Sequence, residues 1–245
     1  TFALAPGASF ALLATEPGGA ASSYVSDLGF AVSTSGTGTI AIGAPVTAAR
    51  VALTTEERLT LGASARIEGT GAGNAVVLAA GRALNNAAGA GVLSAPAGRW
   101  LLYLDRFTSL TGTEPASGSP DLYGRSFAAA PPATLAGFAG NRVVWGEAPV
   151  LTITAGSGTR IYGGAAARLG YTLSGLRDGD GAGTALDGAP TVSSAGNALD
   201  ADAGAYATKA TASASAQGYQ LVFVDGALDV TPAPLTITPF GNRVY

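Results

Sequence analysis

Short runs in which apolar residues alternate with threonine or serine dominate the C-terminal third of the chain. Val150–Ala155 alternates over its whole length, as a half-buried strand does. Two later runs, Tyr219–Val224 and Leu228–Thr231, flank Asp225-Gly226, a dipeptide that favours a tight hairpin turn. We therefore predict a small module of antiparallel strands, with the last two strands joined as a hairpin.

The first hundred residues carry shorter strand-like pieces separated by Gly, Ala, Ser and Asn. Their spacing of about 20 residues is typical of one coil of a parallel β-solenoid. Small apolar side chains would fill its narrow core, and Gly and Asn would turn the corners. Glu56–Arg58 is interpreted as a solvated corner. The Ser and Thr alternation at Ser33–Thr39 is interpreted as a solvated solenoid face, although a flat binding ladder fits the same pattern. The strand-like pieces are Val51–Thr55, Leu59–Leu61, Ala65–Glu68 and Ala75–Ala79.

Residues 95–149 carry most of the aromatic side chains. Gly98–Tyr103 reads as a terminal strand that covers the open end of the solenoid, because an exposed last coil would template aggregation. Thr111–Gly124 contains two prolines and is predicted to be a surface excursion.

A repeat marks the C-terminal region. Leu151–Thr154 recurs as Leu235–Thr238, and Arg160–Tyr162 recurs as Arg243–Tyr245 at nearly the same offset. This period is too long for a solenoid coil and fits a small β domain in tandem. We expect a second module over residues 235–245, cut in mid-motif, and a natural chain that continues further.

The composition supports extended β structure. The chain holds 36 Gly and 13 Pro among 245 residues, and 47% apolar residues argue against disorder. Only 12% of residues are charged, about half the globular average. The net charge of −3 comes with no basic stripe, which argues against nucleic-acid binding. The apolar runs are too short to span a bilayer.

Three residue types are missing: the chain has no Cys, no His and no Met. Their absence removes thiolate and imidazole metal ligands, the thiol nucleophile and the commonest general base. We therefore predict no cofactor and no enzyme activity. The lack of Met favours an internal piece of a longer chain, with any export signal upstream.

Several segments resemble those of large bacterial exoproteins. Gly98–Tyr103, Pro131–Thr134 and Gly140–Arg142 are similar to the end and exit region of the β-helix in filamentous-haemagglutinin-like adhesins of two-partner secretion. Residues 151–234 resemble the MBG-type module, a mostly β, glycine-rich repeat of bacterial surface proteins. The matching pieces are Leu151–Thr154, Tyr162–Gly164, Tyr171–Gly175, Ala203–Tyr206, Tyr219–Val224 and Leu228–Pro234.

The resemblance implies an extracellular protein of the bacterial cell surface, with an outer-membrane transporter as its partner during export. We expect an all-β fold: the end of a right-handed parallel β-solenoid with a capping region, then a small antiparallel β-sandwich-like module. The expected segments are residues 1–97 (coils), 98–149 (capping and exit), 150–234 (module) and 235–245 (second module).

Three functions stay open at this point. The first is a rigid adhesin stalk, and the second is a self-assembling fibre or sheath subunit. The third, a polysaccharide-active β-helix enzyme, is disfavoured because the acidic residues are scattered and not paired across a cleft. Self-assembly contacts or surface glycans are the expected partners.

Two groups of residues are candidates for binding. Asp178 and Asp180 lie two residues apart in a Gly-rich loop, as in a calcium loop, but further oxygen ligands and a closing Glu are missing, so a simple turn is favoured. Tyr162 and its repeat Tyr245 are either exposed rings for glycan stacking or core tyrosines. The core interpretation is favoured, with Arg160 and its repeat Arg243 covering the rings.

Overall fold

The computed structural model describes residues 2–3, 10–12, 24–177, 179–212, 214–239 and 241. The chain forms two compact units. The first unit comprises Thr1–Pro149 with Gln217–Tyr219, and the second comprises Val150–Ala216 with Gln220–Tyr245. Strands predominate in both, so the predicted mostly-β class is confirmed.

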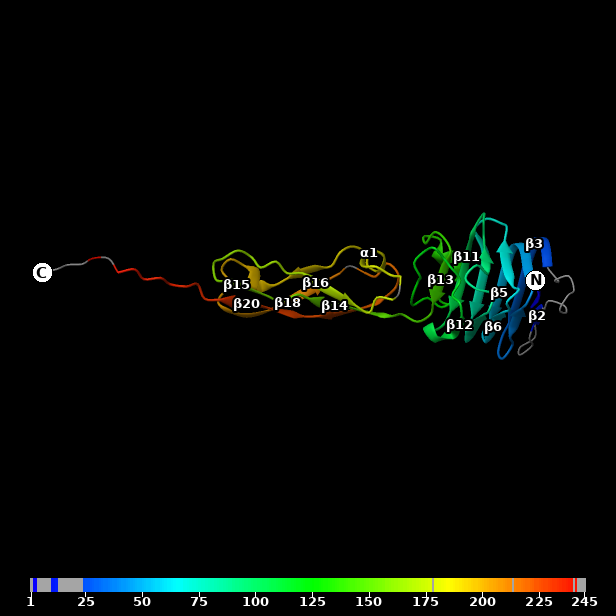
Figure 1. Ribbon diagram of the computed structural model, residues 1–245, viewed down its shortest axis with the longest axis horizontal. Helices are drawn as coiled ribbons and strands as arrows, with labels where there is room; N and C mark the ends of the chain where they lie inside the picture. The colour runs from blue at the N-terminus through cyan, green and yellow to red at the C-terminus, as the bar shows by residue number, and fades with distance from the viewer. Residues whose placement is uncertain are drawn as a thin grey trace. The chain divides into compact units, whose positions relative to one another are not determined.

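Two parallel sheets build the first unit (Figure 1). The larger sheet follows the order β1-β3-β5-β8-β11-β13, with β7 and β10 beside this path. Its strands are β1 Phe2–Ala3, β3 Tyr24–Thr34, β5 Pro45–Thr55, β7 Arg66–Gly69, β8 Asn74–Ala80, β10 Leu93–Ser94, β11 Arg99–Leu104 and β13 Arg142–Trp145. The smaller sheet contains β2 Phe10–Leu12, β4 Ile40–Ile42, β6 Arg58–Leu61, β9 Ala83–Asn86 and β12 Leu110–Gly112.

The chain alternates between these two sheets, so each pass lies on the one before it. Leu53 pairs with Leu78 in the larger sheet, and Leu59 pairs with Leu84 in the smaller one, at the same interval along the chain. The preceding pass, in which Ile40 pairs with Leu59, is shorter. The prediction of parallel strands stacked by successive passes of the chain is therefore confirmed.

Alternation along β5 and β6 produces the core between the sheets. Val46, Val51 and Leu53 of β5 are buried together with Leu59 and Leu61 of β6, while Ala52 and Thr60, which lie between buried neighbours, are partly exposed. Burying such side chains is the main stabilising term, at about 1.5–3 kcal/mol each. The core is thin because each pass contributes only a few inward side chains.

Two corners show how polar residues turn the chain. The Asn86 side chain is 1% exposed and donates to the carbonyls of Gly89 and Thr113 while accepting from the Ala88 amide. Glu56 and Glu57 lie in a bend between β5 and β6, so the predicted solvated corner is confirmed.

The prediction that Gly98–Tyr103 ends the stack is wrong. β11 pairs with β8 on one side and with β13 on the other. The reason is that Val143–Trp145 is also apolar and adds a further strand after a long excursion. The Trp145 indole is fixed there by donating to the Asp121 carboxylate at 2.7 Å.

The excursion between β11 and β13 folds back onto the larger sheet. Leu122 and Leu135 pack against Leu101, Tyr103 and Val144 on its outer face. Leu122 and Tyr123 are buried, so the predicted surface excursion over Thr111–Gly124 holds for most of residues 111–120 but not for these two. Two 3-10 turns, Phe107–Ser109 and Pro132–Leu135, shape the path.

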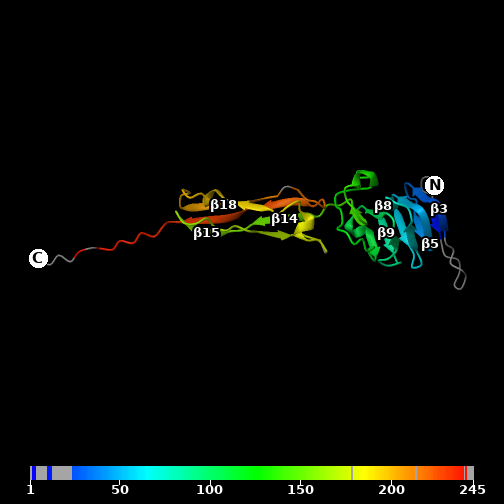
Figure 2. The ribbon, with the colours of Figure 1, turned by 90° about the horizontal axis from the view of Figure 1, so that it is seen from above.

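The second unit contains two sheets of mixed direction (Figure 2). One has the order β16-β14-β19 and the other β15-β20-β18-β17. The strands are β14 Val150–Ala155, β15 Gly158–Ile161, β16 Tyr171–Ser174, β17 Thr191–Ser193, β18 Gly204–Thr211, β19 Gln220–Val224 and β20 Gly226–Thr231. One helical turn, α1 Ala182–Ala185, and a 3-10 turn at Ala195–Asn197 complete the described elements.

The predicted hairpin at Asp225-Gly226 is wrong, and so is the purely antiparallel module. β19 and β20 run on in the same direction in different sheets, where β19 pairs parallel with β14 and β20 pairs parallel with β15. Gly226 does not form a turn but allows the backbone to pass close to Ala155, because a Cβ at residue 226 would lie 2.5 Å from the carbonyl oxygen of Ala155. The Ser157 hydroxyl accepts from the Ala227 amide and bridges the gap between the two ladders.

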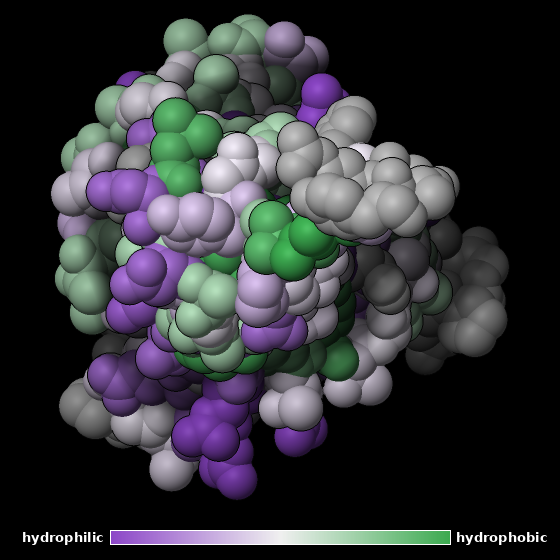
Figure 3. All heavy atoms as spheres, turned by 90° about the vertical axis from the view of Figure 1, so that its left-hand side faces the viewer, coloured by the Kyte–Doolittle hydropathy of each residue, from purple (hydrophilic) through white to green (hydrophobic). Residues whose placement is uncertain are grey.

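Several apolar side chains of the second unit are exposed. The largest exposed fractions there belong to Leu199, Leu235 and Ile237, at 74%, 84% and 79%. On the face that Figure 3 shows, hydrophobic residues form small separate groups among hydrophilic ones.

Candidate functional site

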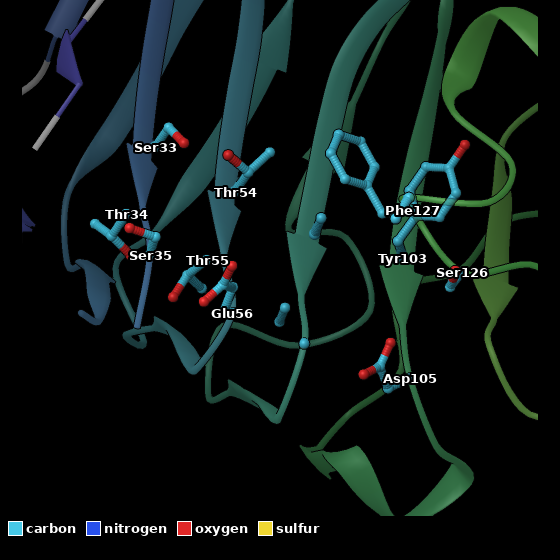
Figure 4. Close-up of a pocket in the computed structure, with 14 residues that line it drawn as sticks. Ser33, Thr34, Ser35, Thr54, Thr55, Glu56, Tyr103, Asp105, Ser126 and Phe127 are labelled. Carbon is cyan, nitrogen blue, oxygen red and sulfur yellow. The ribbon is translucent and has the colours of Figure 1, made fainter. Parts of the chain in front are cut away.

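An open groove of about 500 Å³ lies on the outer face of the larger sheet of the first unit (Figure 4). Its floor follows one row of strand register, in which Ser33 of β3 pairs with Thr54 of β5, and Thr54 pairs with Ala79 of β8. Tyr103 of β11 pairs with Ala79 and continues the row. The groove therefore crosses the strands, because each strand contributes one residue to it.

The alternating pattern explains why these side chains face outward. Val32 and Leu53 precede Ser33 and Thr54 and are buried in the core, so their successors point to the opposite face. Thr34 and Thr55, one position later, are buried, and both hydroxyls donate to the carbonyl of Gly38, at 3.0 and 2.6 Å. These bonds fix the corner that borders the groove.

Two aromatic rings form the wall of the groove. The Tyr103 ring is buried and its hydroxyl donates to the carbonyl of Ala130 at 2.9 Å. Burial raises the pKa of that hydroxyl to about 12, although the positive charge of Arg99 acts in the opposite direction. The hydroxyl therefore stays protonated at neutral pH. The Phe127 and Tyr103 rings pack in an edge-to-face arrangement with their centroids 5.2 Å apart, and Phe127 is 36% exposed.

Two exposed carboxylates stand at the lower rim in Figure 4. Glu56 accepts from the Gly36 amide at 2.7 Å, which holds its side chain beside the corner. Asp105 lies at the end of β11. Among the described residues that line the groove, none is lysine or arginine. The site thus offers hydroxyls, two negative charges and one apolar ring face.

Sequence reasoning points to only part of this groove. The Ser and Thr alternation after Ser33 indicates one edge of the floor. The sequence pattern identifies Glu56 only as part of a corner and Phe127 only as part of the capping region. No local pattern shows that Ser33, Thr54 and Phe127 lie together, since they come from different passes of the chain.

Of the two predicted calcium candidates the structure describes Asp180, which is not among the residues that line this groove. Asp178 lies outside the described residues. Asp180 follows a turn in which its amide donates to the carbonyl of Arg177 at 3.0 Å. Over the described part of the chain, no three acidic side chains gather as a metal site requires.

The favoured core interpretation of Tyr162 is wrong, because the ring is 46% exposed. Its amide donates to the carbonyl of Thr231 at the end of the β15–β20 ladder. Arg160 is the buried member of the pair and is 6% exposed, with its guanidinium directed to backbone carbonyls. These carbonyls belong to Gly164, Gly196 and Ala198, which lie in two different turns, and the arginine donates to both turns. Tyr245 and Arg243 lie outside the described residues.

Among the residues that the structure describes, there is no helix of the length and hydrophobicity needed to cross a bilayer.

Together, the mixed sheets of the second unit and the Tyr-Gly-Gly turn after β15 define a small, mostly-β repeat module. Residues 151–229 match the family described as MBG domain (YGX type). The chain therefore carries an MBG-type module, as the sequence predicted. None of the curated proteins and none of the solved structures matches the chain.

Proposed function

We propose that this chain is a structural segment of a large secreted bacterial surface adhesin or filament, in which it acts as a rigid stalk without catalytic activity. In this proposal the stacked parallel sheets are the end of a right-handed β-solenoid, exported by two-partner secretion through an outer-membrane transporter. The MBG-type match supports a repeat protein of the cell surface. The stacked sheets are consistent with a rigid segment, because every internal strand is hydrogen-bonded to a neighbour on both sides.

The observation that carries the proposal is the pairing of the first and last strands of the second unit. Val150 pairs with Gln220 and Thr154 with Val224 in one ladder, and Gly158 pairs with Leu228 in the next. Both ladders are parallel and keep the same offset along the chain. The strands β14 and β15 therefore lie alongside β19 and β20 from end to end.

This pairing sets how the module responds to tension. The chain enters the ladder at Val150 and leaves it after Thr231, and in a parallel pair these two points lie at opposite ends. A pull through the chain is directed along the strands, so the ladder bonds must break together. A hairpin pulled at its open end would lose its bonds one after another. The module is thus built to transmit force, as a stalk must.

A single-molecule pulling experiment on the full chain tests the proposal. The chain has no cysteine, so introduced cysteines provide unique handles. Handles at Val150→Cys and Ala233→Cys load the ladder along the strands. Handles at Val150→Cys and Gln220→Cys load the same ladder across its end, because these two residues are register partners. We expect a clearly higher unfolding force for the first pair at equal loading rate.

The second pair is the matched control, since the module and the attachment chemistry are the same and only the direction of force differs. Unfolding forces are governed by the unfolding rate under load, which makes the comparison independent of equilibrium stability. Equal forces in the two directions would remove the basis for a load-bearing stalk.

A self-assembling fibre or sheath subunit is the second candidate, and β19 favours it. This strand lies at the edge of its three-stranded sheet, and Val222, Phe223 and Val224 are 39%, 42% and 43% exposed. Exposed apolar edge strands are templates for pairing with another chain.

A further inference from the structure

The groove on the first unit presents hydroxyl groups at a regular spacing. Ser33 and Thr54 are register partners on neighbouring strands, and such partners are about 4.8 Å apart. Ser126 adds a third hydroxyl from the wall. A ligand that lies across the strands therefore meets hydroxyls at Ser33 and Thr54, and then the methyl group of Ala79.

The wall supplies an apolar face at one side of this row. The Phe127 ring is open to solvent, and the buried Tyr103 ring supports it edge-on. The hydrogen bond from Tyr103 to Ala130 fixes the position of the Tyr103 ring, against which Phe127 packs. Aromatic faces of this kind pack against the C–H faces of polar ring compounds.

The charges restrict which polar ligands fit. Glu56 and Asp105 present carboxylate oxygens, which accept hydrogen bonds from hydroxyl groups and repel anions. Arg106 lies beyond Asp105 and, with Glu147, lines an adjoining hollow that shares Asp105 and Ser126 with the groove. The groove itself is therefore complementary to a ligand that is rich in hydroxyls and carries no negative charge.

We propose that this groove binds a neutral oligosaccharide. Such a ligand combines many hydroxyls with apolar ring faces, and the groove volume of about 500 Å³ falls in the range of small-ligand sites. The load-bearing argument for the stalk concerns the ladders of the second unit, so this binding site on the first unit goes beyond it and does not depend on it.

Peptide binding by strand addition is excluded at this groove. β3 and β5 are each paired on both sides, so the floor offers side chains and not a free strand edge. Another copy of the chain carries the same net charge of −3, which does not favour its docking beside Glu56 and Asp105.

Calorimetric titration of the full chain tests the proposal. The probes are short oligomers of glucose, mannose and galactose, with a galacturonate oligomer as the anionic counterpart. We expect at least one neutral oligomer to bind and the galacturonate oligomer not to bind. Phe127→Ala should weaken binding about tenfold, because it removes the ring face.

Tyr162→Ala is the matched control, since it removes a comparably exposed ring from the other unit. We expect it to leave the affinity unchanged. Both tryptophans lie in the first unit, so an unchanged urea midpoint of their fluorescence shows that Phe127→Ala is folded. The proposal is overturned if no neutral oligomer binds at about 1 mM, if galacturonate binds equally well, or if Tyr162→Ala weakens binding as much as Phe127→Ala does.

Discussion

Replacing Arg160 with methionine is expected to destabilise the second unit by about 3 kcal/mol. The guanidinium donates to the carbonyls of Gly164, Gly196 and Ala198 at 3.1, 3.0 and 2.7 Å. Methionine fills a similar space but donates nothing, so three carbonyls lose their partner. Each such loss costs about 1 kcal/mol or more.

The arginine also fastens two segments that are distant in sequence. Its partners lie in the Tyr-Gly-Gly turn after β15 and in the 3-10 turn before β18. Asn197 joins the same region by bonding to both the amide and the carbonyl of Ala167. Loss of Arg160 should therefore loosen the end of the β15–β20 ladder as well as its own contacts.

Urea unfolding followed by far-UV circular dichroism measures this effect. Tryptophan fluorescence serves as an internal reference, because Trp100 and Trp145 both lie in the first unit and should not respond. Arg168→Met, an exposed arginine of the same unit, is the matched control and should change stability by no more than about 0.5 kcal/mol. Equal midpoints for the two variants would contradict the assigned role of Arg160.

A proline at Ala52 should destabilise the first unit by about 3 kcal/mol or more. Ala52 lies inside β5 and pairs with Ala31 on one side and Val77 on the other. Proline removes the amide donor of a strand that has neighbours on both sides, where proline is essentially never tolerated. The change is measured as the urea midpoint of tryptophan fluorescence.

Ala52→Ser is the control that distinguishes loss of the backbone hydrogen bond from the effect of changing the side chain. Serine keeps the amide, and residue 52 points away from the core with partial exposure, so a change within about 0.5 kcal/mol is expected. If proline and serine behaved alike at this position, β5 would not be an internal strand of a parallel stack.

Local patterns identify several of the strands but not their partners. The alternation of Val150–Ala155 predicts β14 because a strand side chain repeats every second residue. The Asp225-Gly226 turn signal fails because pairing with β14 and β15 outweighs a local turn preference. Gly226 is needed there for its missing side chain, which a sequence pattern cannot distinguish from a turn glycine.

The candidate site is harder to predict for the same reason. Ser33, Thr54 and Tyr103 form a row only once the register between passes is fixed, and register depends on the whole stack. Arg160 is buried and Tyr162 is exposed, the reverse of what we expected, because an unpaired buried carbonyl costs more free energy than an exposed tyrosine ring. Which carbonyls are buried and need a donor depends on the three-dimensional fold and is not encoded in a local sequence pattern.

The direction of pairing at β14 and β19 is tested most directly by disulfide trapping in the full chain. Thr152 and Val222 are register partners, about 4.8 Å apart in a parallel pair and within disulfide range, so Thr152→Cys with Val222→Cys should oxidise readily. A hairpin at Asp225-Gly226 would instead bring Val222 opposite Asp229. We predict that Val222→Cys with Asp229→Cys stays reduced, since these residues are about 23 Å apart along one extended course. Trapping of the second pair but not the first, read by mass after thiol labelling, would contradict the parallel pairing.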